Sequence, residues 1–135
     1  MNFTEVNFDT IGSNRIPDNK ISVVHGKNSY VSINSLLSKA ITKSGFTRVK
    51  VYEDREAKTM SLVFNNTGPL PIQPVNETSK VVRIQHKGLV KYICDFFSLP
   101  PMNRKDTLFI SRDKSNVSDQ LTFFIRKDST FEVQL

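Results

Sequence analysis

Hydrophobic and polar residues alternate in two segments of the chain that match each other position by position. Val49, Val51, Leu62 and Phe64 each have an apolar counterpart 59 residues later, and Asp54 recurs in the turn between them. The second set is Leu108, Ile110, Asp113, Leu121 and Phe123. Alternation of this kind is typical of strands with one buried face, and repetition at one offset indicates a duplicated unit. The pattern predicts two equivalent hairpins, repeated without a gap.

A strand and a helix precede each predicted hairpin. Before the first hairpin, Val31 and Ile33 alternate in a short strand, and Asn34 or Ser35 is placed to cap the helix that follows. The apolar positions of this helix follow a helical spacing and are Leu36, Leu37, Ala40 and Ile41. The same order returns before the second hairpin, where the positions expected to be buried are Val82, Ile84, Leu89, Val90 and Ile93.

These elements predict one domain over residues 1–135, because a chain of this length can bury an ordinary core. The expected class is α+β, with a mostly antiparallel sheet, two short helices, tandem β-α-β-β units and internal pseudo-two-fold symmetry. Proline fixes φ and removes an amide donor, so the segment between the units is expected to be an extended linker. The parts are N-terminal strands and loops (1–29), a first β-α-β-β unit (30–66), the proline-containing linker (67–79), a second β-α-β-β unit (80–126) and a C-terminal strand (127–135).

Positive charge is concentrated in two windows of the sequence. Residues 27–50 hold five basic residues and no acidic one, and residues 80–105 hold six basic residues and one acidic one. The whole chain has a net charge of +6, so these windows at +10 leave −4 for the remainder. A partner that presents many phosphates complements such a division of charge. A solvated charged surface is the alternative interpretation.

The residues that most often perform chemistry favour structural roles here. Cys94 is the only cysteine, which excludes a disulfide within the chain, and its apolar helical face favours a buried small residue. His25 and His86 lack a metal-binding spacing, although His86 beside Lys87 is a candidate phosphate contact. Asp54 falls in a predicted turn, where aspartate commonly accepts backbone hydrogen bonds. We therefore expect no enzymatic activity, no metal and no cofactor.

The sequence also bears on where the protein is located. The apolar runs are far shorter than the roughly 20 residues that cross a bilayer. The first ten residues lack the basic and then apolar pattern of a signal peptide. These features predict a soluble cytoplasmic protein that does not bind membranes.

One arrangement of residues resembles a known family. It comprises Val31, Ser32, Ile33, a short helix, Gly45, Arg48, Val49, Lys50, Val51, Asp54 and Leu62. This order resembles the AbrB-like swapped-hairpin DNA-binding element, over roughly residues 30–66 and again over 80–125, and two copies resemble the MraZ-type arrangement. The resemblance implies DNA contacts from the basic residues around each helix and hairpin. Those candidates are Lys39, Lys43, Arg48, Lys50, Arg83, Lys87 and Lys91.

The leading hypothesis is a non-enzymatic nucleic-acid-binding protein, with duplex DNA as partner and a role in transcription regulation. One alternative is a virus-encoded structural or protein-interaction module that binds an acidic protein, which would explain the basic windows equally well. Another is a single-strand binder, because an outward Tyr52 beside Lys50 is placed to stack on an unpaired base. A homodimer is compatible with each, and the units can pair within one chain or between chains.

Overall fold

Eight strands and two helices make up the part of the chain that the structure describes. The structure is a computed structural model, and it describes residues 2–4, 16–76, 80–100, 105–113 and 119–127. Its elements are β1 (Lys20–Val24), β2 (Tyr30–Ile33), α1 (Ser35–Ser44), β3 (Arg48–Asp54), β4 (Thr59–Asn65), β5 (Leu70–Pro71), β6 (Arg83–Ile84), α2 (Lys87–Phe96), β7 (Lys105–Arg112) and β8 (Leu121–Arg126). The order strand, helix, strand, strand occurs twice, as β2-α1-β3-β4 and β6-α2-β7-β8. The α+β class and the antiparallel sheet are confirmed.

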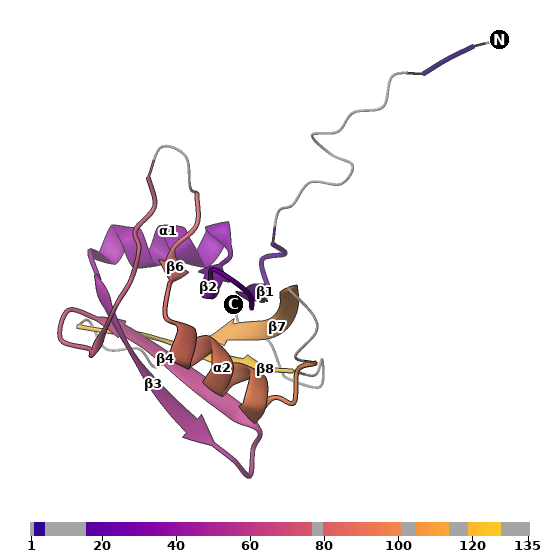
Figure 1. Ribbon diagram of the computed structural model, residues 1–135. Helices are drawn as coiled ribbons and strands as arrows, with labels where there is room; N and C mark the ends of the chain where they lie inside the picture. The colour runs from indigo at the N-terminus through magenta and orange to yellow at the C-terminus, as the bar shows by residue number, and fades with distance from the viewer. Residues whose placement is uncertain (1, 5–15, 77–79, 101–104, 114–118, 128–135) are drawn as a thin grey trace.

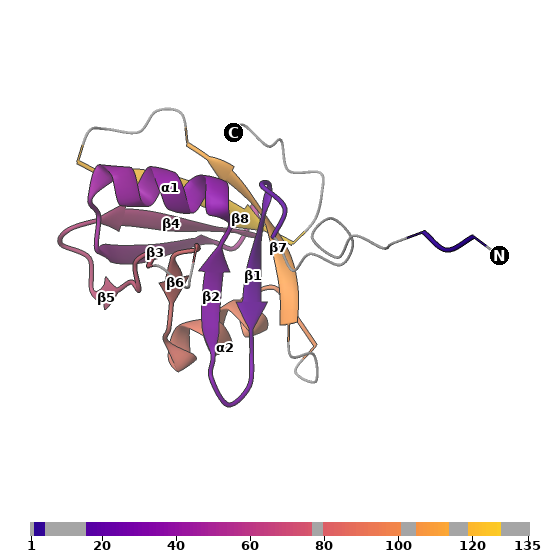
Figure 2. The same cartoon turned by 90° about the horizontal axis from the view of Figure 1, so that it is seen from above.

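The strands form one antiparallel sheet in the order β5-β3-β4-β8-β7-β1-β2-β6. Gln73, two residues after β5, pairs with Arg83 in β6 through backbone N–O hydrogen bonds of 2.7 and 3.0 Å. The two ends of the sheet therefore meet at this one bridge, while β3 beyond Val49 has β4 as its one partner strand among the described residues. Figures 1 and 2 show this curved sheet, with α1 and α2 at different ends of it.

The core lies on the inner face of the curved sheet. Alternate residues of both hairpins point into it, as the sequence pattern predicts, and Phe64 meets Phe123 edge to face with ring centroids 5.7 Å apart. Both helices add apolar side chains to the same core. The fully buried core residues are Ile21, Val31, Ile33, Ile41, Val49, Met60, Leu62, Phe64, Ile84, Val90, Ile93, Leu108, Ile110, Phe123 and Ile125, each 0% exposed.

The first helix begins and ends where its sequence predicts. The side chain of Asn34 accepts a hydrogen bond from the Leu37 amide at 2.9 Å, and Gly45 ends the helix with a φ of 74°, a conformation that glycine adopts at low cost. Leu37 is buried, whereas Leu36 is 46% exposed. The expectation that Leu36 faces the core is wrong, because that helical face points away from the sheet.

The second hairpin is not a gapless copy of the first. In the first hairpin Val51 pairs with Leu62, so an unbroken repeat would pair Ile110 with Leu121. Instead, Ile110 pairs with Ile125, a shift of four residues. Strand β7 ends at Arg112 and β8 begins at Leu121, which leaves a longer connection than the one between β3 and β4. An even shift keeps the same side chains on the buried face, so the hydrophobic pattern alone does not fix the register.

The segment expected as a linker is part of the sheet. It contributes β5, which pairs with β3, and it places Ile72 in the core at 9% exposure. The guanidinium of Arg48 donates hydrogen bonds to the carbonyl oxygens of Gly68 and Pro69. Prolines are tolerated here because β5 is short and its remaining amides find other partners.

Two sequence expectations fall outside the described residues. The predicted C-terminal strand lies outside the described residues apart from Lys127, and so does most of the N-terminal segment before residue 16. Of the strands expected within residues 1–29, β1 is confirmed. Among the described helices, neither has the length and apolar character needed to cross a membrane.

Candidate functional site

Two adjoining hollows beside α1 and β6 collect basic side chains from distant parts of the sequence. The first, of about 640 Å³, lies along α1, and the second, of about 680 Å³, lies over β1, β2 and β6. Both are lined by Ser35 and Lys80, so they form one continuous surface, here called the basic groove. The basic residues that line it are Lys39, Lys43, Lys80, Arg83 and Lys105.

The helix supplies the first hollow. Lys39 and Lys43 are one turn apart on α1 and are both exposed, while Leu37 and Ile41 fix the opposite face of the helix in the core. Ser38 is fully buried and joins the helix to the sheet. Its hydroxyl donates to the carbonyl of Ile33 and accepts from the amide of Val82, at 3.0 and 2.8 Å. These contacts hold the lysine-bearing face of α1 next to the chain that leads into β6.

Three neighbouring strands supply the floor of the second hollow. Ser22 of β1 lies opposite Ser32 of β2, and Ser32 lies opposite Arg83 of β6. Residues paired in this way project from the same face of a sheet. The Arg83 guanidinium lies over the Tyr30 ring, with its central carbon 4.6 Å from the ring centroid, a stacking contact that arginine commonly makes. A row of hydroxyl groups thus ends at an oriented guanidinium.

The charge of the basic groove is uncompensated within the described part of the chain. No aspartate or glutamate lines either hollow. The ion pair identified among the described residues joins Arg55 to Glu53 at 3.2 Å, in the hairpin of β3 and β4 and outside the groove lining. Lysine and arginine side chains that lack carboxylate partners attract anions. The groove is therefore suited to a ligand that presents phosphate or carboxylate groups.

The structure brings three of the seven sequence-predicted contacts into the basic groove. These are Lys39, Lys43 and Arg83. Lys87 and Lys91 are exposed on α2, at a different end of the sheet from α1. The remaining two are on β3, where Lys50 is half-buried and Arg48 holds the Gly68 and Pro69 carbonyls.

Two groove residues were missing from the sequence-based set. Lys80 and Lys105 belong to the second basic window, but Lys80 precedes β6 and Lys105 begins β7, so neither lies on the helix that the family pattern singles out. The pairing of β1 with β7 brings Lys105 opposite Val24, which is itself in the lining of the second hollow. The positive charge of the sequence window 80–105 was the signal that could have identified both residues.

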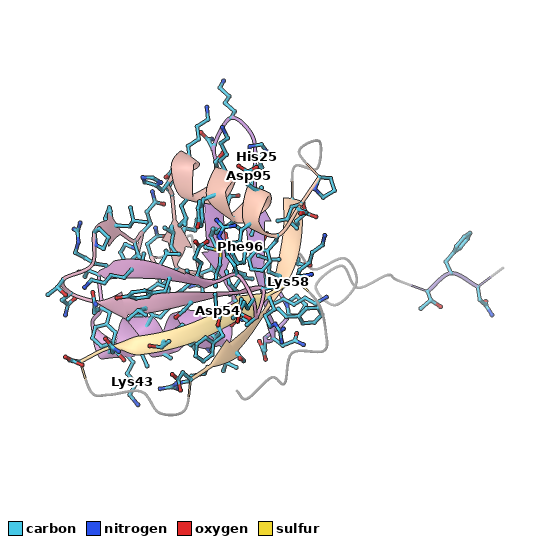
Figure 3. The ribbon with its side chains drawn as sticks, turned by 90° about the horizontal axis from the view of Figure 1, so that it is seen from below. His25, Lys43, Asp54, Lys58, Asp95 and Phe96 are labelled. Carbon is cyan, nitrogen blue, oxygen red and sulfur yellow. The ribbon has the colours of Figure 1, made fainter. Side chains whose placement is uncertain are left out.

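A second surface lies between α2 and the turn that joins β3 to β4. Arg55 and Lys58 line a hollow of about 560 Å³ there with Phe96, and the Arg55 guanidinium lies 5.7 Å from the Phe96 ring centroid. The Tyr92 hydroxyl donates a hydrogen bond to the Glu53 carboxylate, and this bond raises the pKa of Tyr92. Figure 3 shows Lys58 and Phe96 well apart from Lys43. This surface is therefore separate from the basic groove.

The remaining candidates for catalysis or metal binding, Asp54, His86 and Cys94, have structural surroundings that account for them. Asp54 accepts a hydrogen bond from the Ala57 amide at 3.1 Å, which supports its predicted turn role. His86 caps α2, because its Nδ1 accepts from the Leu89 amide at 2.9 Å. Cys94 is half-buried against the core, and burial raises the pKa of its thiol. Across the described ranges, no three His, Cys, Asp or Glu residues form a group that could hold a metal.

Comparison with known proteins leaves the fold and the groove as the basis for inference. Searches against protein-family models, curated proteins and solved structures found no match to this chain.

Proposed function

We propose that this protein is a non-enzymatic nucleic-acid-binding protein that holds the phosphate backbone of duplex DNA in the basic groove. The observation behind this proposal is that five basic side chains and no carboxylate line two adjoining hollows. Phosphate contacts of this kind supply most of the sequence-independent affinity for DNA. Arg83, with its planar guanidinium at the floor, is the best placed of the five to make a directional contact.

The number of basic residues in the groove predicts how strongly DNA affinity depends on salt. Each phosphate that a lysine or arginine neutralises releases condensed counterions, so affinity falls as salt rises. Five contacts correspond to a slope of about −4 to −5 in a plot of log K against log salt concentration. An acidic protein partner would release far fewer counterions, since its charges are less densely spaced. The salt dependence therefore separates the two classes of partner.

We also propose that the two β-α-β-β units are related by an internal pseudo-two-fold axis, as in the AbrB-like arrangement. Two ladders support this. Strands β2 and β6, which open the two units, pair with each other, and so do the closing strands β4 and β8. On this proposal the N-caps Asn34 and His86 correspond, so that Lys91 of α2 takes the position of Lys39 of α1. Lys87 and Lys91 then offer a second, weaker contact surface for regulatory binding of DNA.

A fluorescence-anisotropy titration at two salt concentrations tests the binding proposal. The probes are a duplex and a single strand of the same random sequence. We expect salt-sensitive binding to the duplex, strongly weakened in the double variant Lys39→Glu, Lys43→Glu. The matched control is Lys87→Glu, Lys91→Glu, which makes the same charge change on the other helix and should weaken binding less.

Three outcomes would count against parts of this proposal. Absence of salt-sensitive binding by the unmodified protein would reject nucleic acid as the ligand. Equal loss in the two double variants would reject the basic groove as the principal contact. Tighter binding to the single strand would replace duplex DNA by unpaired nucleic acid, and Tyr52, which is 55% exposed, would then be the first stacking residue to substitute.

A further inference from the structure

We infer that the second hollow of the basic groove is a binding site for a phosphate monoester or free phosphate, a dianion held by Ser22, Arg83, Lys80 and Lys105. The inference goes beyond backbone contacts with DNA, because a terminal phosphate differs from the diesters of a backbone in charge and in its three free oxygens. It rests on unsatisfied polar groups at the floor, on the charge of the walls and on size. Each of these is independent of the lysines of α1.

The floor contains a buried hydroxyl without a partner. Ser22 is 1% exposed, and its Oγ has no hydrogen-bond partner among the described residues. Buried polar groups are hydrogen-bonded in the large majority of cases, because a buried donor or acceptor without a partner destabilises the fold. Ser22 lines the second hollow directly. A ligand oxygen in the hollow would supply the missing partner.

The Arg83 guanidinium, at the end of the same row, also has a buried nitrogen without a hydrogen-bond partner among the residues that the structure describes. The Nε of Arg83 is buried and likewise lacks a hydrogen-bond partner within the described part of the chain. The Tyr30 ring, 4.6 Å from the guanidinium carbon, restricts the plane of the group. Because Tyr30 contacts the face of the guanidinium, a ligand would meet the group at its N–H edge. Arginine in such an orientation is suited to the oxygens of a phosphate group.

The walls determine the charge of the ligand. Lys80 and Lys105 both line the hollow with Arg83, and no carboxylate joins them. No ion pair to any of the three is identified among the described residues. Three cationic side chains around one hollow favour a phosphate monoester, with a charge of about −2, over a phosphate diester, with a charge of about −1. The volume of about 680 Å³ leaves space for the group that the phosphate is attached to.

Three probes distinguish the possible sources of the phosphate. They are inorganic phosphate, a 5′-phosphorylated oligonucleotide and the same oligonucleotide with a 5′-hydroxyl. Amide NMR spectra are recorded in titrations with inorganic phosphate, and anisotropy measures the two oligonucleotides. We expect the amide signals of Ser22, Ser32 and Arg83 to shift with phosphate, and the 5′-phosphate to tighten oligonucleotide binding by about tenfold, equivalent to roughly 1.4 kcal/mol.

The variant Ser22→Ala is the sharpest test of the site. It removes a buried hydroxyl that has no partner, so the midpoint of unfolding should stay the same or rise. We expect its affinity for inorganic phosphate and its preference for the 5′-phosphate to fall by about threefold to tenfold. Lys105→Ser should cause a similar loss through charge. Lys127→Ser, at an exposed lysine directly after β8, is the matched charge control and should leave the preference unchanged.

The outcomes separate this inference from the proposed function. Equal affinity for the two oligonucleotides, with unshifted Ser22 and Ser32 amides in phosphate, would overturn the monoester site and leave DNA binding intact. Phosphate-induced shifts that Ser22→Ala weakens, without binding of either oligonucleotide, would support a site for free phosphate while rejecting the proposed function. Unchanged phosphate affinity in Ser22→Ala would overturn the assignment of Ser22.

Discussion

Asn34 shows how one polar residue connects three parts of this fold. It is fully buried, and its Oδ1 caps α1 through the Leu37 amide. Its Nδ2 donates to the carbonyl oxygens of Asp18 and Lys20, at 2.8 and 2.9 Å, on the chain that enters β1. The cap was readable from the sequence, because Asn before an apolar helical pattern is a common helix start. The bonds to Asp18 and Lys20 were not, since they depend on the packing of β1 beside β2.

Replacing Asn34 separates these two roles. Asn34→Ala should lower the free energy of unfolding by about 2 to 3 kcal/mol, because it removes the cap and the two hydrogen bonds to the Asp18 and Lys20 carbonyls. Asn34→Asp keeps the cap acceptor but places a carboxylate against the Asp18 and Lys20 carbonyls, so it should also destabilise the fold. Chemical denaturation measures both, with the exposed Asn28→Ala as control. A stable Asp variant would mean that capping is the only important role.

Cys94 gives a pH-dependent prediction at the same scale. Burial, followed by the negative charges of Asp106 and Asp95, raises the pKa of its thiol above the ordinary 9.0. The thiolate is the reactive form, so alkylation by iodoacetamide at neutral pH should be slower in the folded protein than in the unfolded chain. The rate should rise with pH, with a midpoint above 9.0. Because the folded state holds this proton more tightly, stability should decline as pH rises above that value. Equal rates in the folded and unfolded protein would contradict the prediction.

At the scale of elements, the sequence predicted which residues are strands and helices better than it predicted how strands pair. Alternating apolar residues identified β3, β4, β7 and β8, since each strand has a buried face. The register of β7 with β8 differs from the repeat by four residues, a change that hydrophobic alternation does not detect. The short β5 was missed because prolines mark a segment as extended without indicating a partner strand.

The connection from β4 to β5 contains a close approach that only glycine permits. A Cβ added to Gly68 would lie 2.7 Å from the Val49 carbonyl carbon and 2.8 Å from its oxygen. Gly68→Ala should therefore displace β5 from β3 and lower the free energy of unfolding by about 1 to 3 kcal/mol. The control is Gly26→Ala, where an added Cβ meets no atom within 4 Å. Thermal melts compare the two variants, and equal melting temperatures would refute the close contact.

At the scale of the whole molecule, the candidate site depends on pairing between distant segments. Residues of the second basic window meet α1 only because β6 pairs with β2 and β7 pairs with β1. The two basic windows of the sequence located this region approximately. The structure shows which of their basic residues share a surface. The lysines of α2 were equally good candidates in the sequence, but α2 lies at a different end of the curved sheet from α1. Sequence spacing contains no information on that separation.

The same pairing predicts that the two units depend on each other for folding. Two ladders join them within one chain, β2 to β6 and β4 to β8, and a third joins β1, which precedes the first unit, to β7. The fragment 1–76 would expose β4, β1 and the inner core face, and the fragment 77–135 would expose the complementary strands. Each fragment alone buries too little apolar surface to offset its loss of conformational entropy. We expect neither to show a cooperative melt by circular dichroism, and a mixture of the two to recover one. A fragment that folds alone would show that its own hairpin and helix suffice, and that the ladders between the units contribute little to stability.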